Sequence, residues 1–372
     1  YMDMSAITPS SMQLNKLKWE TTTEYNTGLD ATFLKGKLRF TVDVYQKYVK
    51  DLLQPKVKMP TTIGYGNGYQ ISYMNSGKMT NKGWEFRVDA VPFQNKDWRV
   101  GVYFNIAHNE NKITEMPDNY IEENYTFGNG NYAYRREEGR PMGSFYGYRY
   151  KGVYQNKDAT YARDIEGNVM KDISGNAIVM RNGSYTVAPG DAIYEDVNHD
   201  GVINQYDIVY LGNSNPRLTG GAGLNVSYKQ FKLSAIFYGR YGQDVVNATR
   251  LNNESMRGID NQSTAVLRRW RNEGDQTDIP RALYGEGYNT LGSDRFVEDA
   301  SYLRLKSLSF TYRLPKKAIQ RWGFNNIDVY VTGYNLFTWT NYTGQDPEVK
   351  TENTYALSLI HISEPTRLRR IS

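Results

Sequence analysis

Long stretches of this chain alternate between apolar and polar side chains, and this period of two limits the possible folds more than any other feature. In residues 84–90 (WEFRVDA) every even-numbered side chain is apolar and every odd-numbered one is charged. Residues 98–106 (WRVGVYFNI) alternate in the same way after the short connection PFQNKD. Successive side chains of a β-strand point to opposite faces, so the pattern predicts two antiparallel strands with one apolar and one polar face each.

The same unit recurs along the chain. Alternating segments joined by short connections lie at 25–33 and 38–47, at 218–228 and 231–242, and at 302–315 and 326–339. A short helix-like segment (316–323, KKAIQRWG) joins the last two. Leu305 and Leu308 are out of phase, which predicts a β-bulge near Lys306 and Ser307.

The connections fall into two classes. Those within the hairpins are short, whereas those between hairpins are long, polar and rich in Gly and Asn: 54–79, 115–138, 157–190 and 246–297. Short turns at one rim and long loops at the other are typical of an outer-membrane β-barrel, which turns its apolar side chains to lipid and its polar ones to a watery lumen. We therefore predict an all-β fold, an antiparallel transmembrane β-barrel.

The alternation assigns side chains to the two faces. The predicted lipid-facing set includes Trp84, Phe86, Val88, Val100, Val102 and Phe104. The predicted luminal set includes Glu85, Arg87, Asp89 and Arg99. Aromatic side chains near strand ends suit the membrane interfaces: Trp84, Trp98, Tyr228, Phe231 and Trp339. A soluble β-sandwich remains the alternative, although segments such as 20–33 and 38–53 are long for its strands, which typically run about 5–6 residues.

Composition excludes several functional classes. There is no Cys, so disulfides and thiolate metal sites are excluded. The net charge is +5 with both signs interspersed, and no basic stripe predicts a nucleic-acid partner. Of the three His, two are far apart and His361 lies in the terminal segment discussed below, so neither a His-rich metal site nor a Ser–His–Asp triad is predicted. No apolar run approaches the roughly 20 residues of a membrane helix, and residues 1–13 do not read as a signal peptide.

One loop has the spacing of a calcium site. Residues 196–207 (DVNHDGVINQYD) fill every position of an EF-hand-type loop, with Gly201 at the turn and Ile203 expected to pack inward. The predicted oxygen ligands are Asp196, Asn198, Asp200, the carbonyl of Val202, Asn204 and Asp207. The final acid is Asp in place of the usual Glu. The alternative is a metal-free turn held by side-chain-to-backbone hydrogen bonds.

At this point five blocks of the chain resemble a known family. Residues 17–53, 74–113, 139–155, 189–245 and 296–349 are similar, in this order, to the SusC/RagA-like TonB-dependent transporters of Bacteroidetes outer membranes. The resemblance implies a large barrel with a luminal plug, which imports glycans or other bulky nutrients together with a SusD-like surface lipoprotein and is energised through TonB. It also implies location in the cell outer membrane.

The resemblance further implies that 1–356 is a C-terminal barrel part. We expect about ten strands, with the plug and the TonB-contacting segment, which are N-terminal in the family, outside this chain. Residues 357–372 (LSLIHISEPTRLRRIS) resemble a translated sequencing adapter and are expected to be non-native, replacing a closing strand.

The functional alternatives differ in class. The first is a nutrient importer, and the second is a secreted β-rich glycan-binding or adhesion module with a dockerin-like calcium loop. An enzyme is not predicted, because no acid pair converges across a common bond. The Tyr-rich tract 124–139 suits either sugar stacking or a structural role. Residues 263–274 are expected to form a short loop helix capped by Ser263.

Overall fold

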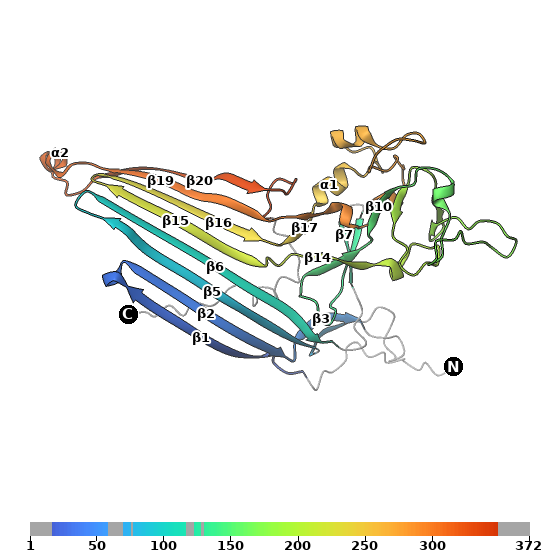
Figure 1. Cartoon of the computed structure of the whole chain (residues 1–372), viewed down its shortest axis with the longest axis horizontal. Coiled ribbons are helices and arrows are strands. Elements are labelled where there is room, and N and C mark those ends of the chain that lie inside the picture. The colour runs from blue at the N-terminus through green and yellow to red at the C-terminus, as the bar shows by residue number, and fades with distance from the viewer. Residues whose placement is uncertain (1–16, 59–69, 76, 117–122, 128–129, 349–372) are drawn as a thin grey trace, which may run out of the picture.

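Eight long strands form one antiparallel sheet in the computed structural model, which describes residues 17–58, 70–75, 77–116, 123–127 and 130–348 (Figure 1). Their spatial order is β1-β2-β5-β6-β15-β16-β19-β20. The bounds are β1 Thr21–Phe33, β2 Leu38–Lys50, β5 Lys78–Gln94, β6 Trp98–Glu115, β15 Leu218–Tyr228, β16 Phe231–Tyr241, β19 Tyr302–Arg313 and β20 Asp328–Thr340. These are the four predicted hairpins. Each strand pairs with its sequence neighbour within a hairpin, as local alternation and short turns require.

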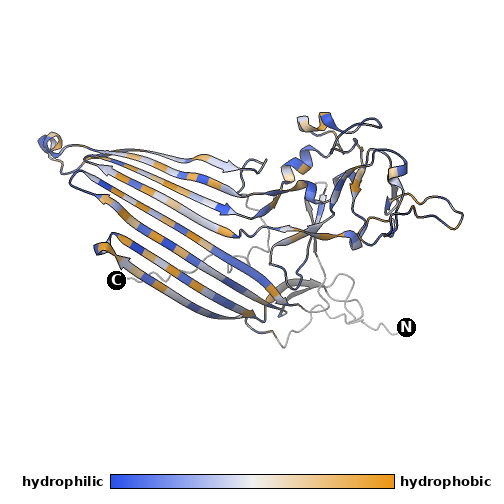
Figure 2. Cartoon of the chain, viewed as in Figure 1, coloured by the Kyte–Doolittle hydropathy of each residue, from blue (hydrophilic) through white to orange (hydrophobic). Residues whose placement is uncertain are grey.

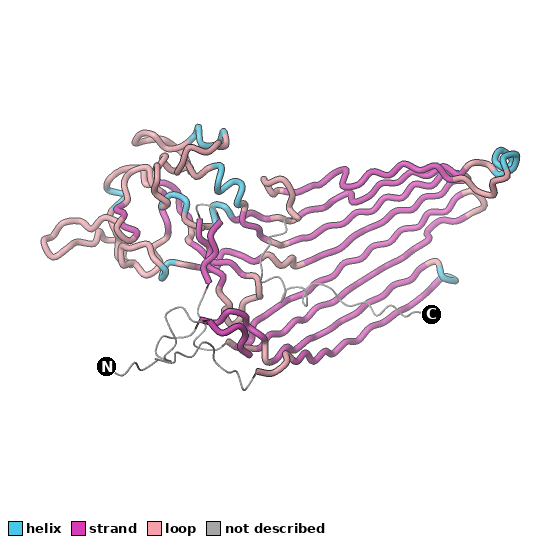
Figure 3. Tube along the Cα trace, turned by 180° about the vertical axis from the view of Figure 1, so that it is seen from behind, coloured by secondary structure: helices cyan, strands magenta, loops and turns pink. Residues whose placement is uncertain are grey.

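All the short turns lie at one end of the sheet and the long connections at the other (Figures 1 and 3). Asn95 shapes one short turn by accepting hydrogen bonds from the backbone N–H groups of Asp97 and Trp98 at 2.9 and 2.8 Å. The helix-like segment forms α2 (Lys316–Ile319) and η8 (Gln320–Trp322), and η1 (Leu34–Gly36) makes the first turn. The predicted two-sided arrangement is confirmed.

The register aligns like side chains across the whole sheet, as the alternating colours of Figure 2 show. One row across all eight strands is apolar: Ala31, Phe40, Val88, Phe104, Ala222, Phe237, Leu305 and Phe337. The neighbouring row on the opposite face is Asp30, Thr41, Arg87, Asn105, Gly221, Tyr238, Arg304 and Thr338. We name these the outer face and the luminal face.

The outer face is exposed, which a sandwich does not allow. Phe104, Phe310 and Val331 expose 46%, 48% and 73% of their surface. Among the described residues, the long strands pack edge to edge with one another and no second sheet covers their apolar side. A sandwich would bury this face between two layers. The sandwich alternative is therefore wrong, and the exposed apolar face is the one a barrel offers to lipid.

Three details refine the sequence prediction. The bulge is confirmed, because the register shifts between Leu305 and Ser307 on both sides of β19. The sheet has eight strands in the described residues, against the expected number of about ten, because strand-like segments of the long connections form separate small sheets. Trp84 is not at a strand end: β5 continues beyond it through residues 78–83. Trp98 and Tyr228 do lie at strand ends, with ring centroids 4.3 Å apart.

The long connections fold into a compact body, which we name the loop assembly (residues 130–216 and 242–300). It and the adjoining connections contain β3 Leu53–Lys58, β4 Gln70–Asn75, β7 Glu123–Phe127, β8 Gly130–Tyr134, β9 Ser144–Gly147, β10 Tyr150–Val153, η3 Asp158–Thr160, β11 Arg181–Asn182, β12 Tyr185–Thr186, β13 Ala192–Tyr194, η4 Gln205–Asp207, β14 Val209–Asn213, β17 Asp244–Val246, α1 Ala248–Asn253, η5 Thr264–Arg268, η6 Tyr288–Thr290, η7 Asp294–Phe296 and β18 Val297–Asp299. Its largest apolar core comprises Tyr154, Ala162, Met180, Val187, Ala192, Tyr194, Ile203 and Tyr288. In the part of the chain that the structure describes, no helix is long and apolar enough to cross a membrane.

Candidate functional site: the luminal face and the loop assembly

The luminal face carries charges that pair with each other across and along the strands. Asp30 accepts a hydrogen bond from the Thr41 hydroxyl at 2.5 Å and lies 3.6 Å from the Arg39 guanidinium. Arg87 forms a two-pronged pair with Asp89 at 2.7 and 2.6 Å. The side chains of these two ion pairs are 37–66% exposed, so they form a hydrated polar surface.

Aromatic rings on the same face lie flat over glycines of the adjacent strand. Tyr103 is the cross-strand partner of Gly223, and Tyr45 is the partner of Gly83. A Cβ atom at Gly223 would lie 2.0 Å from Tyr103 Cε1. The Arg87 guanidinium lies over the same ring, 5.2 Å from its centroid. Planar rings beside cationic and amide groups can bind sugar rings and peptide groups alike.

Arg304 anchors the segment that follows β20. Its side chain is 6% exposed and contacts Asp346 at 2.6 Å and Glu348 at 3.1 Å, while its Nε donates to the Thr338 hydroxyl at 3.0 Å. Because a buried guanidinium without carboxylates would be costly, these contacts hold residues 346–348 against the luminal face.

A buried carboxylate organises the core of the loop assembly. Asp191 is fully buried and accepts hydrogen bonds from Arg281 at 2.7 Å, from Tyr185 at 2.7 Å and from the Ala188 backbone at 2.8 Å. The Asn289 amide adds a contact at 3.2 Å. The partners come from positions up to 98 residues away, so this one side chain joins the two long connections.

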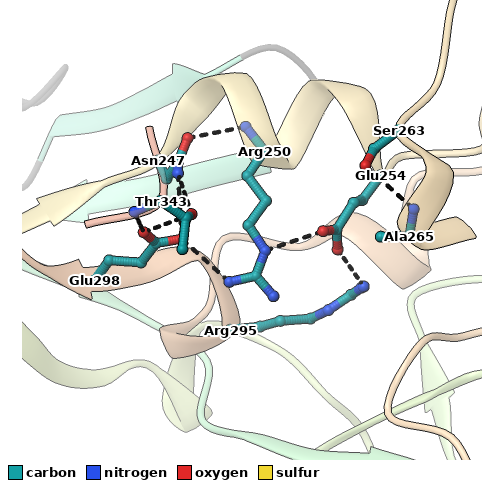
Figure 4. Close-up of polar contacts among 8 residues, drawn as sticks. All are labelled: Asn247, Arg250, Glu254, Ser263, Ala265, Arg295, Glu298 and Thr343. Atoms are coloured by element: carbon teal, nitrogen blue, oxygen red, sulfur yellow. Dashed lines mark hydrogen bonds and ion pairs between the residues drawn. The ribbon is translucent and has the colours of Figure 1, made fainter. Parts of the chain in front are cut away.

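A second network joins the loop assembly to the chain beyond β20 (Figure 4). Arg250 on α1 contacts Glu254 at 3.0 Å and Glu298 on β18 at 3.2 Å. Arg295 contacts Glu254 at 2.8 Å, and both side chains are nearly buried. Glu298 accepts hydrogen bonds from the backbone and the hydroxyl of Thr343, each at 2.8 Å. The ion pairs hold the loop assembly together, and the hydrogen bonds from Thr343 to Glu298 connect it to the chain beyond β20.

Residues 196–207 close into a tight loop. Asp196 accepts hydrogen bonds from the backbone N–H groups of Asp200 and Gly201 at 3.2 and 2.8 Å, and Asp200 accepts from Val202 at 2.8 Å. Gly201 has a φ of 79°, which its position in the turn requires. Ile203 is fully buried in the largest core, as predicted.

The predicted ligands are brought together only in part. The side chains of Asn198 and Asn204 contact Asp200 at 2.9 and 3.5 Å, and the Asn204 amide also contacts the Val202 carbonyl at 3.1 Å. Asp207 instead binds the backbone N–H groups of Val197 and Asn204, both at 2.8 Å, and closes the base of the loop.

The carboxylates of this loop make a cation favourable. Burial raises the pKa of Asp207, and the nearby carboxylates of Asp196 and Asp200 raise it further, while the backbone hydrogen bonds oppose the shift. In the described residues no three carboxylate or imidazole side chains converge as a metal cluster. Carbonyl and amide oxygens would therefore have to complete a calcium shell here.

Two lesser predictions have clear outcomes. Tyr132 of the Tyr-rich tract is fully buried and donates to the Ser293 carbonyl at 2.8 Å, so its role is structural. Residues 117–122 and 128–129 lie outside the described residues.

Ser263 caps η5 as predicted, accepting a hydrogen bond from the Ala265 backbone N–H at 3.2 Å (Figure 4). The segment is a five-residue 3₁₀ helix, shorter than expected.

Sequence reasoning did not find Asp191, Arg281, Glu254 or Arg304 as organising residues. Each is a charged residue in a stretch that also contains exposed charges, and the partners are distant in the chain. Burial of a charge is what singles them out, and alternation does not report burial within loops.

Comparison with known proteins agrees with this architecture. The family model described as TonB dependent receptor-like, beta-barrel matches residues 3–336. TonB-dependent receptor P3 of Formosa agariphila is 32% identical over 91% of this chain and 32% of its own length. TonB-dependent receptor SusC of Bacteroides thetaiotaomicron is 30% identical over 90% of this chain and 30% of its own length. The chain therefore spans about a third of the length of these relatives.

Solved structures give the same result. The structure of the RagAB peptide transporter matches with a TM-score of 0.69 and 27% identity, over 91% of this chain and 34% of the other. The RagAB peptide importer in its open-open state matches with a TM-score of 0.64. Receptors of this kind are outer-membrane β-barrel proteins, in agreement with the exposed apolar face. The chain belongs to the TonB-dependent receptor-like β-barrel family of the outer membrane, and within this family it is similar to the SusC-like receptors.

Proposed function

We propose that this chain forms part of the barrel wall and of the extracellular loops of an outer-membrane importer for bulky polar nutrients. The observation that carries the proposal is the luminal face, whose paired charges and flat tyrosines line one side of a sheet that is apolar on the other. Such a wall binds a polar solute weakly along its path, as a transporter requires. We infer transport and not catalysis, in keeping with relatives that are TonB-dependent receptors.

The partners we propose are a SusD-like surface lipoprotein and the TonB complex. The loop assembly supports the first, because it is a folded body at the long-loop end with its own apolar core, suited to carry a lid. TonB contact would be made by parts of the receptor outside this chain. The likeness to the RagAB importer supports a two-component assembly.

An oligosaccharide is the substrate class we place first. The luminal tyrosines offer aromatic rings and hydroxyl groups, and Arg87, Asp89 and Asn105 offer hydrogen-bonding groups that match sugar hydroxyls. Oligopeptides are the second candidate, and the specific observation in their favour is the likeness to a peptide importer.

The test is calorimetry on the full-length receptor with its lipoprotein, titrated with neutral oligosaccharides and with oligopeptides of similar mass. Tyr103→Ala should weaken binding of the true substrate by about fivefold or more, because an aromatic ring and its hydroxyl are removed from the luminal face. The matched control is Tyr241→Ala, on the outer face and 62% exposed. An equal effect of both variants, or binding of neither ligand class, would contradict the proposal.

We also propose that the 196–207 loop holds calcium as a structural ion. The carboxylates of Asp196 and Asp200, the amide oxygen of Asn198 and the Val202 carbonyl would bind it, with Asn204 and Asp207 closing the shell. The buried charge of Asp207 supports the fit, since a cation would offset it. The bound ion would supply rigidity to a loop that packs Ile203 into the core.

A further inference from the structure

The outer face changes abruptly from apolar to polar near the long-loop end of β2, β5 and β6. The last row with apolar side chains contains Val44 and Trp84, with His108 in register on β6. The next row, Gln46, Lys82 and Glu110, is wholly polar. Consecutive rows on one face are about 7 Å apart, so the boundary is sharp. In an outer-membrane barrel such a boundary marks the upper edge of the hydrocarbon layer.

A groove of about 600 Å³ straddles this boundary, and its lining includes Tyr25, Gln46, Lys82, Trp84, His108 and Glu110. Trp84 and Tyr25 lie on the outer face, and Trp84 is 38% exposed. His108 packs 6.0 Å from Trp84, and its Nδ1 donates to the Arg217 carbonyl at 2.6 Å, which fixes the imidazole in place. The groove is therefore built from the rings of Trp84 and His108 in the lower row, and from the Tyr25 ring with Gln46, Lys82 and Glu110 in the row above.

The polar rows above the groove are basic. Lys50, Lys82 and Lys112 are all exposed and share the outer face. Glu110 pairs with Lys82 at 2.9 Å. Among the described residues, no acidic side chain forms an ion pair with Lys50 or Lys112. The patch therefore complements an anion located at the level of the lipid headgroups.

We propose that this groove binds the phosphorylated sugar headgroup of an outer-leaflet glycolipid. The sugar would lie against Trp84 and Tyr25, and the phosphate would contact Lys82 and the neighbouring lysines. The acyl chains would continue down the apolar rows below, beginning with Val44 and Phe86. A soluble nutrient does not fit this position, because the groove opens to lipid and not to the lumen. The inference rests on membrane placement and not on the proposed import function.

The chain supplies a matched control at the opposite interface. Lys96 and Trp98 have the same spacing as Lys82 and Trp84 but lie at the short-turn end, where the headgroups belong to the inner leaflet. Trp98 is 40% exposed, close to the value for Trp84. A loss of generic aromatic or cationic membrane contacts would affect both pairs equally.

The experiment is native mass spectrometry of the delipidated full-length receptor in detergent, incubated with bisphosphorylated lipid A, with its dephosphorylated form, or with inorganic phosphate. Lys82→Gln should reduce the fraction carrying bisphosphorylated lipid about fivefold, and Lys82→Gln with Trp84→Ala should reduce it further. Lys96→Gln with Trp98→Ala should leave it unchanged. Heat-modifiable migration on gels confirms folding, and Lys82, 63% exposed at its side chain, is safe to replace.

Three outcomes overturn the proposal: equal retention by the Lys82 variants and the receptor, equal loss in the Lys96 and Trp98 variant, or equal binding of the dephosphorylated lipid. Binding of inorganic phosphate in place of lipid would also overturn it, because the proposed occupant is a lipid. None of these outcomes bears on import, which is measured separately with soluble ligands.

Discussion

The ring of Tyr103 lies flat across Gly223, its cross-strand partner on β15, so closely that a Cβ on the glycine would lie 2.0 Å from Tyr103 Cε1. The glycine gives up side-chain packing in the strand, and the tyrosine ring supplies it from the neighbouring strand. The pair fixes the ring on the luminal face, where Arg87 packs over it. Tyr45 and Gly83 repeat the arrangement two strands away.

Gly223→Ala should displace the Tyr103 ring and destabilise the barrel by about 1–3 kcal/mol, the usual cost of overpacking. The matched control is Gly101→Ala, also luminal, whose nearest atoms to a new Cβ are backbone oxygens at 4.0 Å. The midpoint of heat-modifiable migration of the full-length receptor should fall for the first variant only. Equal midpoints for the two variants would show that the close approach carries no strain.

Asp191→Asn should lower the free energy of unfolding of the loop assembly by about 3 kcal/mol. The substitution removes the buried carboxylate that neutralises the Arg281 guanidinium. Arg281 is one-third exposed, which keeps the effect at the low end. Hydrogen exchange of residues 185–194 measures it. The control is Glu195→Gln, whose pair with Arg149 is more exposed and should contribute under about 1 kcal/mol. Unchanged exchange in the first variant would remove Asp191 from its organising role.

Acid should release the segment beyond β20 from the loop assembly. Burial opposes ionisation of Glu298, but hydrogen bonds from Thr343 and contacts with Arg250 and Asn247 outweigh it and hold its pKa below the ordinary 4.5. An acid with a lowered pKa stabilises the fold fully above the ordinary value, and this stability is lost as the pH falls through the lowered one. Exchange of the Thr343 amide, corrected for its intrinsic pH dependence, should therefore rise below about pH 4.5. In Glu298→Gln the corrected exchange should stay flat, and a matching rise there would refute the assignment.

Calcium binding to the full-length receptor should weaken at least about tenfold in Asp200→Ala, because a ligand is removed from the 196–207 loop. The matched control is Asp172→Ala. Asp172 closes a similar turn by accepting hydrogen bonds from the backbone N–H groups of Ser174 and Asn176 at 2.8 and 2.9 Å, but its turn lacks the other oxygen ligands. Calorimetry that finds no calcium binding, or finds binding unchanged by Asp200→Ala, would leave the metal-free turn as the better description.

Alternation sufficed to predict the sheet because each strand has one solvent and one lipid environment, and a one-residue slip would reverse every side chain. It placed Trp84 and Arg87 on the correct faces, and the phase of Leu305 and Leu308 located the bulge. The beginning of β5 was missed because residues 78–83 lie beyond the apolar rows, where an apolar face is not needed.

The loop assembly was beyond the reach of such patterns. Its core depends on contacts between distant segments, such as Asp191 with Arg281 and Tyr194 with the Tyr288 carbonyl at 3.0 Å. The local sequence there has no hydrophobic periodicity, and only turn residues such as Gly201 can be recognised from it. The spacing of 196–207 correctly predicted a closed loop with Ile203 inside, while its metal remains a prediction.

The most direct test of the account is site-directed spin labelling of two adjacent residues of β5. The chain has no Cys, so in a receptor without other cysteines Phe86→Cys and Arg87→Cys each give one label site. In outer-membrane vesicles, the label at 86 should collide preferentially with oxygen dissolved in lipid, and the label at 87 with a water-soluble nickel complex. The same reversal should recur at Val88 and Asp89. Equal accessibility of adjacent positions to both reagents would contradict a barrel wall with lipid on one side and a watery lumen on the other.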